Sequence, residues 1–343
     1  MSETTAKSAF GMNDQEQAGS ALVVVDSPSH VEQTRALAAL REWDAQASGA
    51  YPENTKRAWR ADWAQFRAFC EAREFVALPA LAATVRAFVL HCVEQGKKPA
   101  TVRRYIATLA RAHKAADLEN PCIQEPVRLA LKEMTQTLAI RQRQARPLGW
   151  SEIQEFNNGA GLGIRADRER ALLCVAYDTM ARRAELVALN LEDLTCGADG
   201  SGTALIRRSK SDQAGEGARV YLSRETIRYL QTWIGGAQIK SGALFRRIVG
   251  RKSIGERLHP NIIADIYKRV GRRLRLPDEE VARISGHSIR VGATQDLLAM
   301  NIDLASVMQA GRWKSTIMPM RYGEHVLAAR GGMARAAAKQ GRD

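Results

Sequence analysis

Apolar residues recur every three or four positions over much of the first 140 residues, which is the period of helices with one buried face. In the run TKRAWRADWAQFRAFCEAR, apolar side chains from Trp59 to Cys70 fall on one face, and Asn54 or Thr55 is a suitable N-cap. The same pattern predicts helices over residues 31–47, 55–73, 81–95, 99–116 and 125–139. These helices predict a small all-α bundle.

Two stretches lack this pattern. Residues 1–30 are polar and lean acidic, which predicts a flexible tail. Residues 140–150, IRQRQARPLGW, are basic and contain Pro147 and Gly149, which predicts a linker. The chain should therefore fold as two domains, residues 31–139 and residues 151–343.

The sequence of the second domain predicts both helices and short strands. Helices are expected over residues 151–157, with Ser151 as a cap, and over residues 165–181. The short runs TALIRR and ARVYLS, residues 203–208 and 218–222, predict two strands, and the Gly-rich segment between them predicts a hairpin loop. Four further helices should follow. The expected fold class is mainly α, with one small antiparallel sheet in the second domain.

Composition and charge narrow the range of functions that the protein could have. The apolar fraction of 45% and the charged fraction of 26% are typical of a soluble globular protein. We expect a cytoplasmic protein, because the sequence has neither a secretory signal nor an apolar run long enough to span a bilayer. The net charge of +14 favours a polyanionic partner, either nucleic acid or an anionic membrane surface, although it could serve solubility alone.

The five cysteines have no CxxC spacing and no histidines at metal-site spacing, so we expect reduced core residues and no metal. They are Cys70, Cys92, Cys122, Cys174 and Cys196.

Four separate segments of the second domain carry groups suited to one phosphodiester. They are Arg182 and Glu185 in ARRAEL, Lys210 after the first strand, His287 and Arg290 in SGHSIRVGA, and Trp313 and Tyr322 in GRWKSTIMPMRY. The three-residue spacing predicts that Arg182 and Glu185 share a helix face. Gly286 and Ser288 suit a helix N-terminus, where free N–H groups favour a phosphate.

The residue types fit phosphoryl transfer. Two arginines can offer forked donors to the non-bridging oxygens, and a tyrosine can attack in line with the leaving 5′ oxygen. A lysine on a hairpin can protonate that oxygen, and a histidine can exchange the phenol proton. Neither a metal nor ATP is needed, so no cofactor is expected. Each residue alone would more often be structural, and the ordered set is what points to catalysis.

These motifs resemble the tyrosine recombinase, or phage integrase, family. The resemblance is carried by AYDTMARRAE around Arg182, by SGHSIRVGA at 285–293 and by VMQAG at 307–311 before GRW, and it covers residues 30–325. It implies a site-specific DNA recombinase in which Tyr322 is the nucleophile. Tyr322 would form a 3′-phosphotyrosine and free a 5′-OH, with strand exchange between two target sites leading to integration, excision or inversion.

The resemblance also implies roles for the other groups. Arg182 and Arg290 would clamp the scissile phosphate, Lys210 would be the general acid, and His287 would assist proton transfer. Trp313 stands where many relatives have histidine, and its indole N–H can still donate to the phosphate. The carboxylate of Glu185 would orient the arginine and the histidine.

The implied partner is double-stranded DNA with an inverted-repeat target site. The implied assembly is a homotetramer on two DNA sites, with the C-terminal helix docked into a neighbouring subunit. The candidate DNA contacts are Lys56, Arg57, Arg60, Arg103, Arg104, Arg246, Arg247, Asn261, Lys268, Arg269 and Arg272. Asn261, Ala264 and Arg104 differ from a family member at these positions, so the target sequence should differ too.

Two other classes of function remain open from the sequence. A type IB-like topoisomerase or a hairpin-forming telomere resolvase would use the same catalysis with another outcome. A basic, non-enzymatic DNA-binding regulator would need none of the catalytic set.

Overall fold

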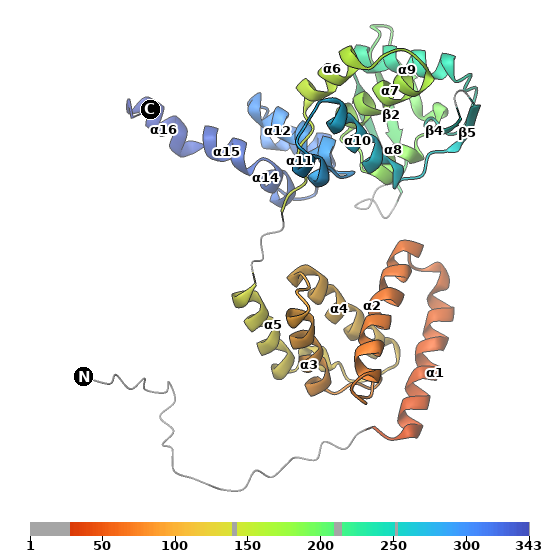
Figure 1. The fold of residues 1–343 in the computed structure, drawn as a ribbon, viewed down its shortest axis with the longest axis vertical. Helices are drawn as coiled ribbons and strands as arrows, with labels where there is room; N and C mark the ends of the chain where they lie inside the picture. The colour runs from red at the N-terminus through yellow and green to blue at the C-terminus, as the bar shows by residue number, and fades with distance from the viewer. Residues whose placement is uncertain (1–27, 139–142, 209–214, 251–252, 343) are drawn as a thin grey trace. The chain divides into compact units, whose positions relative to one another are not determined.

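The computed structural model describes residues 28–138, 143–208, 215–250 and 253–342. Contacts within the chain divide it into two compact units, one up to Gln142 and one from Arg143 onward (Figure 1). Each unit is described by itself below. The predicted tail falls almost wholly outside the described residues, as do residues 140–142 of the predicted linker.

The first unit is an all-α bundle, as the hydrophobic period predicts. Its helices are α1 (His30–Gln46), α2 (Glu53–Glu71), α3 (Ala82–Glu94), α4 (Pro99–Ala115) and α5 (Glu125–Thr137). Short 3₁₀ turns lie at Ala47–Gly49 and Pro121–Ile123. The core is aromatic and aliphatic, with Phe66 and Phe88 in edge-to-face contact at 5.1 Å between ring centroids. The predicted cap at Asn54 or Thr55 is wrong, because α2 already begins at Glu53 after the extended Pro52.

The second unit is also mainly helical. Its helices before the sheet are α6 (Trp150–Gly159), α7 (Ile164–Thr179) and α8 (Arg183–Ala188). Its later helices are α9 (Arg224–Gly236), α10 (Ile262–Arg273), α11 (Asp278–Arg283), α12 (Ser288–Ala299), α13 (Leu304–Gly311), α14 (Ile317–Tyr322), α15 (Glu324–Arg330) and α16 (Gly332–Lys339). The prediction of four later helices is wrong: the described part of the chain holds eight, several too short to show a helical period.

In the described residues the strands form two antiparallel sheets. β1 (Leu194–Cys196), β2 (Gly202–Ile206) and β3 (Ala218–Leu222) pair in that order, preceded by a 3₁₀ turn at Leu191–Asp193. β4 (Arg246–Val249) pairs with β5 (Ser253–Arg257). The predicted hairpin is therefore confirmed, but the expectation of a single sheet is wrong. β4 and β5 are rich in arginine and half exposed, so the hydrophobic pattern did not mark them.

The core of the second unit encloses α7, whose residues 171–176 are all buried. The described part of the predicted linker also packs into this unit. Leu148 is 1% exposed, and its N–H donates to the Ser288 carbonyl at 3.0 Å. The predicted cap at Ser151 is wrong, because Gly149 precedes the helix and its N–H donates to the Glu152 carboxylate at 2.9 Å.

Candidate active site and nucleic-acid interface

The first part of the site is a carboxylate held between two arginines. Arg182 lies just before α8, so the prediction that it shares a helix face with Glu185 is wrong. Instead the Arg182 backbone N–H donates to Glu185 Oε2 at 3.0 Å, and its Nη1 donates to Oε1 at 2.6 Å. Arg312 Nη2 donates to Oε2 at 2.8 Å. Burial alone would raise the pKa of Glu185, but these bonds and charges outweigh it and lower the pKa.

The second part is the N-terminus of α12. His287 stands at the N-cap, as the motif predicts for a phosphate-binding helix start, and its backbone N–H donates to Ser285 Oγ at 3.2 Å. Burial within the protein lowers the pKa of the His287 imidazole, although the residue keeps an exposed surface, and the charges of Arg290 and Arg182 lower it further. The lowered pKa favours the neutral imidazole, which can accept a proton.

Arg290 lies one turn further along α12 and is only 3% exposed. Its guanidinium donates to the backbone carbonyls of Met180 and Gly311, which ties the end of α7 to the end of α13. Burial and the nearby charges of Arg182 and Arg312 lower its pKa, yet a guanidinium remains cationic at neutral pH.

Trp313 connects this arginine to the tyrosine. The Arg290 Cζ lies 4.2 Å from the centroid of the Trp313 ring, and the Trp313 and Tyr322 rings meet edge-on at 6.0 Å. Tyr322 is the last residue of α14, and its carbonyl accepts bonds from Gln144 and Gln295. These two bonds occupy a helix-end carbonyl that has no partner within the helix.

The structure thus gathers six of the seven predicted catalytic residues into one linked cluster. Lys210 lies outside the described residues. Arg312, which lies in the GRW motif and contacts the same carboxylate as Arg182, was not predicted. Its position beside Trp313 in this motif was the available signal.

The second unit presents predicted DNA contacts along one side of α10. Asn261 and Arg272 are exposed and Lys268 is half exposed, opposite the buried Ile266 and Tyr267. Arg269 is engaged within the protein, since its Nη2 lies 2.6 Å from the Glu169 carboxylate.

At the second sheet, Arg247 on β4 is exposed. Arg246 instead donates to the carbonyls of Ala243 and Ser241, at 2.9 and 2.6 Å, so it holds its own loop.

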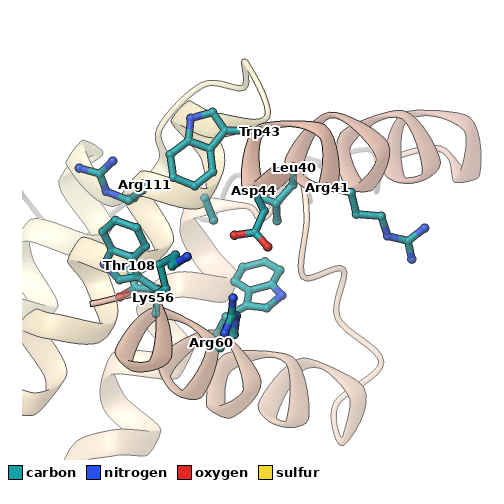
Figure 2. Close-up of a pocket in the computed structure, with 11 residues that line it drawn as sticks. Leu40, Arg41, Trp43, Asp44, Lys56, Arg60, Thr108 and Arg111 are labelled. Atoms are coloured by element: carbon teal, nitrogen blue, oxygen red, sulfur yellow. The ribbon is translucent and has the colours of Figure 1, made fainter. Parts of the chain in front are cut away.

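The predicted contacts of the first unit lie on α2 and α4. Lys56 and Arg60 each lie 3.1 Å from the Glu53 carboxylate and line a cavity of about 210 Å³ between α1, α2 and α4 (Figure 2). Arg57 is exposed beside Asn54 at 3.4 Å. Arg103, also exposed, donates to Thr135 Oγ1 at 2.7 Å.

Arg104 makes a forked pair with Asp62, at 3.0 and 2.7 Å. Asp62 is 1% exposed and was missed from the sequence, although an acid within the apolar stripe between Trp59 and Phe66 was a visible signal. Arg104 therefore stabilises the bundle and still shows about half of its side chain to solvent.

The described ranges contain no group of three or more His, Cys, Asp or Glu side chains placed to hold a metal ion. None of the helices in those ranges is long and apolar enough to cross a membrane. Four cysteines are buried as predicted, but Cys196 on β1 is exposed.

Comparison with known proteins settles the family. The model of the phage integrase family matches residues 147–328, which is more than half of the chain. The chain belongs to the phage integrase family. The predicted enzyme class, a tyrosine-type site-specific DNA recombinase, is thereby confirmed.

Two curated relatives of this recombinase extend beyond the family region. An integrase/recombinase xerD homolog of Selenomonas ruminantium is 28% identical over 285 residues, covering 79% of this chain and 81% of the relative. Recombinase cre of Escherichia phage P1 is 24% identical over 302 residues, covering 83% and 88%. The similarity to recombinase cre is modest.

Solved structures support the fold. A lambda integrase dimer bound to a COC′ core site matches with a TM-score of 0.56 at 16% identity, covering 82% of this chain and 93% of that one. The Tn1549 transposon integrase in complex with circular intermediate DNA matches with a TM-score of 0.56 at 14% identity, covering 83% and 94%. The prediction of a mainly α recombinase fold is confirmed.

Proposed function

We propose that this recombinase cleaves DNA with Tyr322, and that the cluster around Glu185 and Arg290 is its active site. The observation that carries the proposal is the chain of contacts from Tyr322 through the Trp313 ring to the guanidinium of Arg290. A phosphodiester bound by this cation would lie beside the phenol, which is the arrangement that in-line attack needs.

In the proposed reaction the Tyr322 oxygen forms a bond to the scissile phosphorus, and the bond from phosphorus to the 5′ oxygen breaks. Arg182 and Arg290 would stabilise the extra negative charge of the pentacoordinate transition state. His287, whose lowered pKa favours the neutral form, would take the phenol proton, and Lys210 would protonate the leaving 5′ oxygen. Attack by a 5′-OH from the second DNA site reverses these steps and completes strand exchange.

We assign the helical bundle of the first unit to DNA binding and the second unit to catalysis. The exposed cations of α2 and α4, and those of α10, would contact the duplex. An inverted-repeat site and a tetramer on two such sites fit a symmetric exchange between identical protomers. A cytoplasmic location stays a prediction.

Two successive experiments test the proposal: selection of the target DNA, and trapping of the covalent complex on that DNA. Tyr322→Phe protein, which keeps the ring but lacks the attacking oxygen, would first enrich its target from randomised duplex DNA. That duplex, nicked just 3′ of the scissile phosphate so that the short leaving strand diffuses away, is then incubated with wild-type and Tyr322→Phe proteins.

Wild-type protein should accumulate as a covalent complex, whereas Tyr322→Phe should bind the duplex and form none. Two-site deletion or inversion products would support recombination. Relaxation of supercoiled DNA without such products, or a covalent complex that persists in Tyr322→Phe, would contradict the proposal.

A further inference from the structure

Arg312 is the second partner of the carboxylate that holds the proposed clamp. Its Nη2 donates to Glu185 Oε2 at 2.8 Å, and its Nη1 donates to the Thr179 carbonyl at 2.7 Å. Its side chain is 9% exposed, against 23% for Arg182. Arg312 therefore contacts the acid from inside the protein, while Arg182 keeps a surface open to a ligand.

The backbone at Arg312 indicates that the side chain is needed there. Arg312 ends α13 in the left-handed conformation, with φ 54° and ψ 45°. Glycine adopts this conformation freely, whereas a residue with a Cβ is disfavoured there. The contacts of the guanidinium offset that cost.

The second arginine changes the net charge of the group around Glu185. Glu185 alone would cancel the positive charge of Arg182, since its Oε1 lies 2.6 Å from the Arg182 Nη1. With Arg312 on the other oxygen, the three groups together carry one net positive charge. Added to Arg290, whose pKa responds to the Arg312 charge, the site then offers two positive charges to a transition state with about two negative charges.

We propose that Arg312 is a positioning residue: it holds the second oxygen of Glu185, so that Glu185 orients Arg182 without cancelling the positive charge offered to the phosphate. The inference rests on the proposed function and adds a residue to its machinery. It does not require Arg312 to touch DNA.

The test compares two substrates in one preparation of each protein. The first is the selected nicked duplex, and the second is the same duplex with a methyl group in place of one non-bridging oxygen of the scissile phosphate. The methyl group removes one negative charge from the transition state, so the neutral substrate needs less positive charge from the protein.

Arg312→Gly removes the guanidinium, and glycine adopts the left-handed backbone conformation at this position without strain. A loss of rate in this variant can therefore be assigned to the missing side chain and not to a strained backbone. We expect covalent complex formation to slow by about 10- to 100-fold on the phosphodiester and by less than about 3-fold on the methylphosphonate, with unchanged duplex affinity. Arg312→Lys keeps the charge but lacks the fork, so it should recover part of the rate. Asn301→Gly, at another left-handed position (φ 59°), is the matched control and should cleave as the wild type does.

The outcomes separate the two proposals. Equal losses on both substrates would mean a purely structural role, and an unchanged rate would mean none; either would overturn the inference and leave Tyr322 cleavage standing. Because the ratio of the two rates is taken within one preparation, a smaller folded fraction cannot imitate the expected result. Failure of the wild-type protein to form a Tyr322 complex would overturn the proposed function itself.

Discussion

Gly292 in the SGHSIRVGA motif tests how closely α12 packs on the segment before α6. A Cβ built on Gly292 would lie 2.1 Å from the Leu148 carbonyl oxygen and 2.3 Å from its carbonyl carbon. Both atoms belong to backbone, so no side-chain rotation can relieve the clash. Gly292→Ala must push the segment away by roughly 1 Å, weakening the Leu148–Ser288 hydrogen bond and the packing of buried Leu148.

The lost hydrogen bond contributes about 1 kcal/mol and the disturbed packing about 1–3 kcal/mol, so we expect a destabilisation of about 3 kcal/mol. For a unit of this size that lowers the melting temperature by about 6–12 °C. Calorimetry of the full chain measures the shift, and hydrogen exchange in α7 peptides assigns it to the second unit. Cleavage should also fall, because Arg290 lies on the same helix and a shift of about 1 Å can cost about 100-fold in rate.

Gly235→Ala is the matched control, because Gly235 is also helical, on α9, and a Cβ there meets nothing within 4 Å. Alanine should raise the melting temperature slightly, since it favours the helix by up to about 1 kcal/mol. A Gly292→Ala protein that melts with the wild type and cleaves at full rate would refute the close approach.

Three further outcomes follow from the first unit and the sheet. Arg104→Met should destabilise the first unit by about 2–3 kcal/mol in urea unfolding, because Asp62 stays buried without its cation, and adding Asp62→Leu should restore most of it. Burial lowers the pKa of His113, whose Nε2 accepts the Ala80 N–H at 3.0 Å. The unfolded state therefore binds the proton first, and stability should fall as pH drops below about 6.5, but not in His113→Gln. A maleimide should label Cys196 alone in native protein and all five cysteines in denaturant.

The helices of the first unit could be predicted because each long helix repeats one apolar face. The candidate catalytic residues could be proposed from the sequence because their types and order match phosphoryl-transfer chemistry and a family pattern. Neither signal depends on knowing which parts of the chain meet in space.

The features that could not be predicted from the sequence depend on contacts between distant segments of the chain. Arg312 contacts Glu185 across 127 positions of the chain, and Gln144 reaches Tyr322 across 178. The helices α11 and α14 have six residues each and α13 has eight, so none is long enough to show a clear helical period in the sequence. The ion pairs of Arg104 with Asp62 and of Arg269 with Glu169 join residues 42 and 100 positions apart, so only the folded chain shows them.

The most direct test of the central claim is to find the nucleotide on the tyrosine. The covalent complex formed on the nicked duplex is digested with nuclease and trypsin, and the peptides are sequenced by mass spectrometry. A nucleotide phosphate on Tyr322, within residues 315–330 or 322–330, is the predicted result. An adduct on any other residue, or none on a protein that binds the duplex, would contradict the account.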